Sequence, residues 1–519
     1  MNLEQDRNRG PLASRRQVTG GMTALLAASA ATRAAARPAA AQPQNEADAR
    51  YRPRIHYSPP RGFMNDPNGL IRVGADYHLY YQHNPTDTAP GNVHWGHAVS
   101  RDLLSWRTLP AAIAPNAAGP AFSGSAVFDA ENSSGLFHRP GGGVVAIYTR
   151  AGRTQVQEIA ASHDGGLTFV GYRGNPVLDV GSDQFRDPKV FWHAPTRRWI
   201  MAVVRAREHR VVFYGSTDLK AWTELGAFSQ AGLLGIDYEC PDLVETPVEG
   251  GGSRWVLFLS INPGAPLGGS AVQYFVGDFD GARFIPDDRA TRLADFGKDF
   301  YAFQTFSGID GAPVGIAWMS NWQYCSALPT GGWRGVMTLP RTLSLRRQAD
   351  GWRLVQRPVG LETAGGQTLI ADQPSAATPI PPGEALEVRV SMAMAGGAVT
   401  TLRFANTQGE RLEVGLDGTN AVTALWVDRG GATGFRHRFF TDKMSLAVAP
   451  STRALDLQLI FDRCSLEIFA NDGAESGTLL HFFQQPPDRI EVSASDGATL
   501  PALTVRTLRP QAVAASSPS

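Results

Sequence analysis

Three carboxylates that stand close to a proline are the residues of this sequence best suited to catalysis. They are Asp66 in NDP, Asp187 in RDP and Glu239 in ECP. Proline fixes its own backbone and restricts the residue before it, so each acid is held at the entry of an extended segment. Carboxyl groups can serve as a nucleophile and as a general acid, and this pairing is the chemistry of glycoside hydrolysis.

Other catalytic signatures are missing from the sequence. It has no GxSxG, no GxxxxGK[ST], no HExxH and no dinucleotide fingerprint in a strand-to-helix context, which disfavours serine hydrolysis and nucleotide chemistry. His94 and His97 lie in HWGH, an aromatic-rich segment. We interpret both as packing or hydrogen-bonding residues, with metal ligation as the alternative. We therefore expect no metal and no cofactor.

A repeated pattern indicates which elements position the acids. A polar cluster, an apolar strand, a turn and a second apolar strand recur in five copies, at 63–85, 122–150, 185–204, 238–260 and 300–322. Spacings of 58, 63, 52 and 64 residues separate the markers Asp66, Gly124, Asp187, Glu239 and Phe303. A unit of this length is typical of a β-propeller in which each repeat forms a four-stranded blade. The sequence predicts five blades, in a catalytic domain over 50–347.

The repeat also predicts where the acids meet. The innermost strands of a propeller line its axial channel, so residues at the matching start of each repeat converge on one funnel. Asp66, Asp187 and Glu239 are all placed at that start. Any one of them alone could be a turn residue, because Asp, Asn and Pro favour turns. Three carboxylates in one partly dehydrated funnel would repel one another, which favours a catalytic role for the set.

The pattern changes after Arg347. A segment rich in Pro, Gly and Ala, predicted to be a linker, covers 348–383, and period-2 runs such as RLEVGLDG and LDLQLIF follow. Such alternation is typical of antiparallel strands with one buried face. We predict a β-sandwich over 384–508 and a disordered tail over 509–519. The predicted fold class is all-β, a five-bladed β-propeller followed by a C-terminal β-sandwich.

The N-terminus has the features of an export signal. SRRQV at 14–18 precedes a weakly hydrophobic stretch from Gly20 to Ala31 and a run of small residues that ends at Ala41. This pattern indicates a twin-arginine signal peptide over 1–41, with a mature protein that begins near Gln42. The alternative is an Ala-rich leader with a chance pair of arginines. We expect an exported protein, periplasmic or extracellular.

Charge and composition limit the partners of the protein. The chain has 48 basic and 48 acidic residues and a formal net charge of zero, which argues against nucleic acid or an acidic membrane held by bulk charge. No later segment reaches the length of about 18 apolar residues that a membrane span requires. Cys240, Cys325 and Cys464 are widely spaced and odd in number, so we expect no disulfide framework. We expect a monomer whose partner is its sugar substrate.

Eight motifs in order resemble glycoside hydrolase family 32, the family of invertases, inulinases and levanases. They are HYSPPRGFMNDPNGL (56–70), YYQHNP (80–85), WGHA (95–98), FSGS (122–125), FRDP (185–188), YECPDL (238–243), DFGKDFYAFQ (295–304) and WRGVMTLPRTL (333–343). FDRCSLEIFANDG (461–473) is similar to the sandwich motif of that family. Cys464 departs from the pattern, which has a small hydroxyl residue there, and we expect this cysteine to touch only the accessory domain.

The resemblance implies a role for each acid. Asp66 would be the nucleophile, Glu239 the general acid/base, and Asp187 the stabiliser of the transition state, holding hydroxyls of the terminal fructosyl ring. A nucleophile must be ionised, which the neighbouring Asn65 favours. A general acid must be protonated, and Glu239, flanked by Tyr238 and Cys240 and facing another carboxylate, is expected to have a raised pKa.

The same resemblance implies a sugar pocket and a reaction. The pocket would be lined by Asn65, Gln82, Trp95, Phe122, Ser123 and Arg186, although packing between blades is an alternative role for Trp95 and Phe122. The reaction would be retaining hydrolysis of β-fructosides with release of fructose. We expect an exo-acting fructan β-fructosidase of the levanase type that also cleaves inulin and sucrose.

Other functions remain as alternatives. Within the family these are an invertase restricted to sucrose and short oligosaccharides, an endo-levanase and a fructosyltransferase. An inverting glycosidase of arabinosides or xylosides would have a wider gap between its carboxyl groups, and MNDPNG together with YECP argues against it. A catalytically inactive sugar-binding propeller should have lost at least one acid, and all three are present.

Overall fold

The computed structural model describes residues 46–138, 140–349, 351–393, 397–420, 422–448, 454–495 and 500–510. Strands make up nearly all of the regular structure in these residues, and the helices are α1 (Glu46–Tyr51), η1 (Ala194–Thr196), η2 (Ala206–Glu208) and η3 (Cys325–Ala327). The predicted all-β class is confirmed. None of the described helices is long and apolar enough to cross a membrane. The predicted signal peptide over 1–41 lies outside the described residues.

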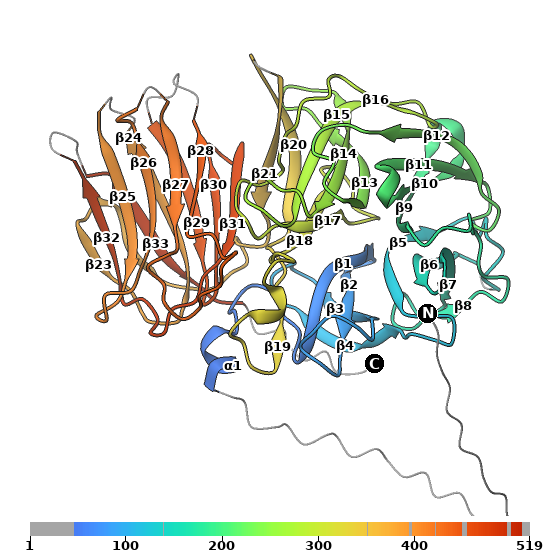
Figure 1. Cartoon of the computed structure of the whole chain (residues 1–519), viewed down its shortest axis with the longest axis horizontal. Coiled ribbons are helices and arrows are strands. Elements are labelled where there is room, and N and C mark those ends of the chain that lie inside the picture. The colour runs from blue at the N-terminus through green and yellow to red at the C-terminus, as the bar shows by residue number, and fades with distance from the viewer. Residues whose placement is uncertain are drawn as a thin grey trace, which may run out of the picture. The chain divides into compact units, whose positions relative to one another are not determined.

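Five small sheets follow one another along the first part of the chain (Figure 1). The first two contain β1 (Gly62–Val73), β2 (Asp76–Asn84), β3 (His94–Ser100) and β4 (Arg107–Ile113), joined by β19 (Trp333–Arg334), and then β5 (Ala121–Asp129), β6 (Gly143–Ala151), β7 (Gln155–Ser162) and β8 (Val170–Gly171). The third contains β9 (Phe185–His193), β10 (Arg198–Arg205), β11 (Arg210–Ser216) and β12 (Thr223–Ser229).

The remaining two small sheets complete the set. They contain β13 (Asp237–Pro247), β14 (Ser253–Asn262), β15 (Ala271–Phe279) and β16 (Phe284–Pro286), and then β17 (Tyr301–Thr305), β18 (Val314–Trp318), β20 (Arg341–Gln348) and β21 (Gly351–Pro358). Each of the five copies of the sequence repeat corresponds to the first two strands of one sheet. The repeat therefore marks real structural units.

The first strands of the five sheets pack against one another in a closed ring. Strand β1 contacts β5, β5 contacts β9, β9 contacts β13, β13 contacts β17, and β17 contacts β1 again. Each of these strands is continued outward by the other strands of its sheet. This is the arrangement expected of a β-propeller, in which the inner strands line an axial channel. The starts of the inner strands are therefore the place to look for the predicted acids.

Two six-stranded sheets lie face to face after the ring (Figure 1). One contains β22 (Thr368–Pro374), β33 (Ala502–Leu508), β24 (Ala385–Ala393), β29 (Ala454–Phe461), β30 (Ser465–Ala470) and β31 (Glu475–Leu480). The other contains β23 (Ala377–Pro379), β32 (Arg489–Ala494), β25 (Val399–Ala405), β26 (Arg411–Asp417), β27 (Ala424–Asp428) and β28 (Lys443–Ala447). Both sheets contribute alternating apolar side chains to one core, among them Val388, Leu457, Leu402 and Val414, as sandwich packing requires.

The segment 348–383 is not the linker that the sequence analysis predicts. Strand β21 pairs with β20 and completes the fifth small sheet, while β22 and β23 are edge strands of the two sandwich sheets. The prolines that suggested a linker end these strands, at Pro358, Pro374 and Pro379, where proline is tolerated. Arg509, assigned to a disordered tail, pairs with Gly365, and residues 511–519 lie outside the described residues.

A buried charged network joins the ring to the sandwich. Arg341 of β20 lies 2.6 Å from Glu467 of β30 and 3.2 Å from Asp295, which precedes β17. His56, ahead of β1, lies 2.9 Å from both Glu467 and Asp462, through its two ring nitrogens. Charges this deeply buried are tolerated only when they are paired and hydrogen-bonded. The sandwich is therefore part of the structure that supports the ring.

Cys464 has a wider role than the sequence analysis predicts. It lies in an apolar cluster with Phe435 of the sandwich and with Met319 and Trp333, which belong to the loop after β18 and to β19. The thiol therefore lies among side chains of both the sandwich and the ring, since the β29–β30 turn that carries it faces the ring. Cys240, Cys325 and Cys464 are all free and buried.

Candidate active site

Each of the five inner strands loses its regular pairing where it enters the ring. The register shifts lie between Met64 and Pro67, Ala121 and Gly124, Arg186 and Lys189, Glu239 and Asp242, and Tyr301 and Gln304. In each case two residues of the inner strand face one residue of its neighbour, which is a β-bulge. Bulges redirect side chains and are common beside active sites. All three predicted acids lie in or next to these bulges.

The acids do not occupy the matching positions that the sequence analysis predicts. Glu239 is the last paired residue before the bulge of β13, opposite Ser260. Asp187 is the first of the two bulged residues of β9, and Asp66 is the second of the two bulged residues of β1. Asp187 has a φ of 64° and Cys240 a φ of 46°, a left-handed conformation that a residue with a side chain adopts only where its surroundings hold it. The bulges therefore bring acids from three different repeat positions to one place.

Asp66 is the most heavily hydrogen-bonded acid of the site. It is 7% exposed, and its carboxylate accepts hydrogen bonds from Asn65 Nδ2 at 3.0 Å, Gln82 Nε2 at 3.2 Å and Ser123 Oγ at 2.7 Å. Donors aimed at a carboxylate favour its ionised form. Burial acts in the opposite direction and raises the pKa of Asp66, partly offset by the bonds from Ser123 and Asn65. The contact with Asn65 that the sequence analysis expects is present.

Glu239 is held from two other inner strands. Arg186 Nη2 of β9 lies 3.2 Å from Glu239 Oε1 and 3.2 Å from Asp237 Oδ2, and the hydroxyl of Tyr301 on β17 donates to Glu239 Oε2. Burial raises the pKa of Glu239. The charge of Arg186 and the hydrogen bond from Tyr301 lower it, the charge of Asp66 raises it, and the net effect is a rise. The side chain is still 20% exposed, so it can reach solvent and substrate.

Asp187 lies against the strand that carries Glu239. It accepts a hydrogen bond from the backbone N–H of Cys240 at 3.0 Å, and the thiol of Cys240 lies 3.5 Å from Asp66 Oδ2 and 3.7 Å from Asp187 Oδ2. Burial raises the pKa of Asp187 to about 7; Arg186 opposes the rise, and the carboxylates of Glu239 and Asp66 add to it. A raised pKa is therefore a property of all three acids, and does not single out Glu239 as the sequence analysis expects.

The predicted pocket residues separate into two groups. Asn65, Gln82, Ser123 and Arg186 contact the acids directly. Trp95 does not: it is 0% exposed, and its Nε1 donates to the carbonyl of Phe122 at 2.9 Å.

Trp95 therefore has the packing role that the sequence analysis left as an alternative. Its ring lies 5.7 Å from that of Tyr80 and 5.8 Å from that of Tyr148, so it fills the space between the first two sheets. A side chain without exposed surface cannot touch a sugar. Its hydrogen bond to Phe122, which is half-buried, instead holds the strand segment next to Ser123.

Tyr301 is a site residue that the sequence analysis missed. It is the last paired residue before the bulge of β17, which is the position that Glu239 has in β13. Alignment of FYAF (300–303) with YECP (238–241) would have revealed it, because both segments open a copy of the repeat. Burial, and then the charge of Glu239, raises the pKa of Tyr301 well above its usual value, so its hydroxyl stays protonated and donates.

The histidines of HWGH form part of the packing. His97 Nε2 lies 3.0 Å from His78 Nδ1, and its ring stacks on Tyr80 at 4.4 Å. His94 Nδ1 lies 2.7 Å from the carbonyl of Asn92. Within the described part of the chain, no group of three or more His, Cys, Asp or Glu side chains is arranged to hold a metal ion.

A second polar layer lies beneath the acids. Lys189 of β9 lies 2.8 Å from Asp242 of β13, and its Nζ donates to the carbonyl of Thr305 on β17 at 2.7 Å. Asp242 in turn accepts a hydrogen bond from the N–H of Thr305 at 2.6 Å. All three residues are at most 5% exposed. Each of these residues follows Asp187, Glu239 or Tyr301 along the same inner strand, so the layer joins β9, β13 and β17 beyond the acids.

Comparison with known proteins identifies the family. Residues 56–358 match the model of the glycosyl hydrolases family 32 N-terminal domain, and residues 355–507 match that of the family 32 C-terminal domain. The chain belongs to glycosyl hydrolase family 32. The resemblance seen in its motifs is confirmed, and the two matched regions meet at β21, where the ring ends.

Family 32 relatives with different names are similar to this chain to nearly the same degree. It is 39% identical to an invertase of Schizosaccharomyces pombe, over 88% of this chain and 85% of the relative. It is 41% identical to an extracellular exo-inulinase of Meyerozyma guilliermondii (86% and 93%) and 39% identical to a levanase of Bacillus subtilis (89% and 71%). The structure of a β-fructofuranosidase from Schwanniomyces occidentalis, complexed with fructosyl-erythritol, superimposes with a TM-score of 0.82 at 37% identity, over 89% of this chain and 99% of that one.

Proposed function

We propose that this family 32 protein is a retaining hydrolase that releases fructose from the end of β-fructosides. The observation that carries the proposal is the convergence of Asp66, Asp187 and Glu239 on one site, each with different partners. The Asp66 carboxylate accepts hydrogen bonds from three side chains and is 7% exposed, whereas the Glu239 side chain is 20% exposed and is held by Arg186 and Tyr301. Two carboxyl groups in unlike surroundings are the requirement for separate nucleophile and acid roles.

The proposed reaction has two displacements. Asp66 attacks the anomeric carbon of the terminal fructosyl unit while Glu239 gives its proton to the departing glycosidic oxygen, which leaves a fructosyl ester on Asp66. Glu239 then takes a proton from water, whose oxygen attacks the same carbon and releases Asp66. Asp187 and Arg186 are placed to hold ring hydroxyls through charge-assisted hydrogen bonds.

The stereochemistry of the product tests the covalent step. Two displacements at one carbon restore its configuration, so fructose released from a β-fructoside should first appear as the β-anomer. NMR spectra recorded within the first minutes, before mutarotation, would show it. Initial release of the α-anomer would mean a single displacement by water and would contradict the nucleophilic role of Asp66.

We further propose that the substrate is a fructan, cleaved from its end, with levan as the first choice. The buried pair of Lys189 and Asp242 supports a funnel that is closed beyond the acids, and such a funnel would admit a chain end more readily than the middle of a chain. Relatives named exo-inulinase and levanase are consistent with a fructan, while the equally similar invertase supports sucrose as a second candidate. Sucrose should also be cleaved, because its fructosyl unit fits the same terminal site.

Product analysis distinguishes these substrates. We expect the purified protein to release fructose alone from levan and inulin, and fructose and glucose from sucrose. Chromatography of samples taken at timed intervals would identify these products. A ladder of oligosaccharides would indicate endo action, and longer products formed from concentrated sucrose would indicate transfer. Good cleavage of sucrose with both polymers left intact would identify an invertase and contradict the fructan proposal.

We also propose an exported monomer built from five blades and a sandwich. The closed contact ring of β1, β5, β9, β13 and β17 supports the five blades. The extracellular exo-inulinase among the relatives supports export, which is consistent with the arginine pair near the N-terminus. Light scattering of the purified protein would give the mass that tests the monomer.

A further inference from the structure

A loop of the sandwich reaches the side of the ring on which the proposed active site opens. It joins β27 to β28 and covers residues 429–442. Lys298 Nζ donates to the carbonyl of Phe439 at 2.6 Å and to Thr441 Oγ1 at 2.9 Å. Lys298 lies three residues before Tyr301 in the sequence, and the hydroxyl of Tyr301 donates to Glu239. Three extended residues span about 10 Å, so the 429–442 loop lies within a few sugar rings of the general acid.

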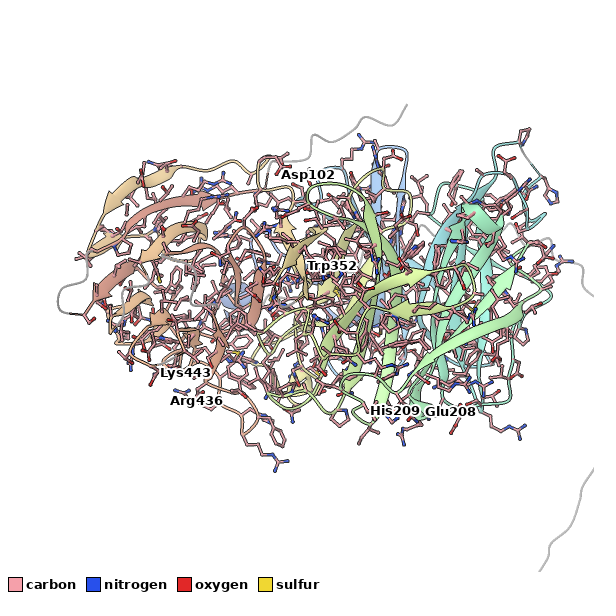
Figure 2. All side chains as sticks on the ribbon, turned by 90° about the horizontal axis from the view of Figure 1, so that it is seen from above. Asp102, Glu208, His209, Trp352, Arg436 and Lys443 are labelled. Carbon is pink, nitrogen blue, oxygen red and sulfur yellow. The ribbon has the colours of Figure 1, made fainter. Side chains whose placement is uncertain are left out.

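Figure 2 agrees with this placement. It shows Arg436 of the loop along the same edge of the molecule as Glu208 and His209, with Asp102 at the opposite edge. Glu208 and His209 lie in the turn between β10 and β11. At the end of β10, before this turn, Arg205 pairs with Phe185. Phe185 begins β9 and lies two residues before Asp187. The edge that carries Arg436 is therefore the edge onto which the funnel opens.

Buried contacts fix the 429–442 loop from below. The Arg429 guanidinium lies 3.4 Å above the ring of Phe440 and 2.6 Å from Asp299, and its Nε donates to the carbonyl of Thr441 at 2.8 Å. Tyr324, in the loop after β18, packs on Phe440 at 5.1 Å. A loop held this firmly presents its outer side chains in one arrangement, so little conformational entropy is lost when a ligand binds.

The outer side of the loop forms an open hollow of about 660 Å³. It is lined by Gly430, Arg436, His437, Arg438, Phe440, Thr441 and Asp442. Phe439 stands beside these residues with 38% of its surface exposed, and the guanidinium of Arg438 lies 4.6 Å over its ring. The exposed ring of Phe439 thus adjoins a hollow lined by several groups that can form hydrogen bonds, a combination typical of ligand sites.

The hollow offers both donors and acceptors of hydrogen bonds to a ligand. Arg436 lies 3.8 Å from Asp442, so donors and an acceptor stand side by side, and Arg438 adds a further donor group. Sugar hydroxyls both donate and accept hydrogen bonds, and therefore suit an arginine next to an aspartate. The C–H faces of a sugar ring can pack on an aromatic surface such as that of Phe439.

We propose that this hollow binds a fructan chain several units away from the bond that is cleaved. The inference rests on the proposed function and extends it, because it gives the sandwich a part in the selection of polymer over sucrose. Contacts so far from the reacting carbon hold the substrate equally well before and during the reaction. Their loss should raise KM and leave kcat unchanged.

Substitution of the outer side chains tests this site. Phe439→Ala and Arg436→Ala should each lower kcat/KM for levan and inulin about five- to tenfold, through KM, because a few aromatic and arginine contacts carry most of the binding energy. kcat/KM for sucrose should stay unchanged. Phe128→Ala is the matched control: Phe128 is 42% exposed near the end of β5 that lies away from Ser123, so its loss should change neither substrate. Thermal unfolding of each variant would verify the fold.

Each contrary outcome is informative. Equal losses for sucrose and polymer, or polymer kinetics like those of wild type, would overturn the proposed site. A change of solution mass without a change in polymer kinetics would identify the loop as a contact between copies, and would also overturn it. If the wild-type protein cleaves sucrose and neither polymer, the proposed fructan-binding site is excluded, while the proposed hydrolase function stands. Wild-type protein that cleaves no fructoside at all would contradict the proposed function itself.

Discussion

Asp66→Asn should lower kcat by about 10⁴-fold or more, because no covalent intermediate can form without the carboxylate. Glu239→Gln should lower kcat by about 10²- to 10⁴-fold, which is the contribution typical of a general acid/base. Both amides are close in size to the acids that they replace. The donors around Asp66, from Asn65, Gln82 and Ser123, and Arg186 beside Glu239, would remain. We therefore expect both variants to fold.

The two roles can be distinguished from each other by the leaving group. A fructoside with an acidic phenol as leaving group needs little protonation, so Glu239→Gln should recover much of its first step with that substrate, whereas Asp66→Asn should not. Azide should then react with the fructosyl ester that accumulates in Glu239→Gln. Kinetics with sucrose and with such a fructoside, with unfolding curves as the check on the fold, would measure both effects.

Asp237→Asn is the control for charge. Asp237 lies as close to Arg186 as Glu239 does, at 3.2 Å, but it stands two residues earlier on β13, at the start of the strand. Its substitution removes the same negative charge from the same arginine, and kcat should change far less. Turnover near that of wild type in Asp66→Asn or in Glu239→Gln would exclude the assigned role.

Much of this site could be predicted from the repeat. The copies of the pattern place Asp66, Asp187 and Glu239 near the start of inner strands, and the structure brings all three together. The sequence does not reveal the bulges, because one extra residue in a strand looks like a short change in the alternation of apolar and polar residues. The acids were therefore expected at one repeat position, and Tyr301, which matches the position of Glu239, was missed.

Other residues show why sequence patterns have limits. Trp95 is an aromatic residue beside a functional motif, and only packing shows that its ring is buried between two sheets. The segment 348–383 contains the glycines and prolines of a linker, yet it forms strands at sheet edges, where those residues are allowed. The network around His56 and Asp462 joins residues about four hundred positions apart, a distance at which local sequence carries no signal.

Asp462→Asn should destabilise the protein by about 3–5 kcal/mol, the cost of breaking a buried ion pair. Asp462 accepts hydrogen bonds from the N–H groups of Arg54 at 2.8 Å and Ile55 at 3.0 Å, and its contact with His56 is 2.9 Å. The amide group of asparagine would leave His56 with one fewer charged partner and would place a donor among donors. Asp472→Asn is the control: Asp472 pairs with Arg357 while 67% exposed, so the loss should be at most about 1 kcal/mol.

The same ion pair gives stability a defined pH window. Burial alone would lower the pKa of His56, but its hydrogen bonds to Asp462 and Glu467 raise it to about 9. Because the folded pKa lies above the unfolded value of about 6.5, this contribution is complete below pH 6.5 and is lost as the pH rises through 9. Burial alone would raise the pKa of Asp462, but the bond from His56 lowers it to about 2, so its contribution is lost only as the pH falls from about 4 to 2.

Unfolding in urea across pH tests this window. The free energy of unfolding of the wild-type protein should exceed that of His56→Gln by the largest amount between about pH 4 and 6.5. The difference should shrink by about 3 kcal/mol as the pH rises to 9, since each unit of pKa shift corresponds to about 1.4 kcal/mol. A difference that is constant from pH 5 to 9 would mean that the pKa of His56 is the same in the folded and the unfolded protein, and a difference that falls as the pH drops below 6.5 would mean that His56 is neutral in the folded protein. Because His56 precedes β1 and Asp462 follows β29, the ring and the sandwich should unfold in one transition below pH 6.5. Two transitions there would show that the charged network does not couple them.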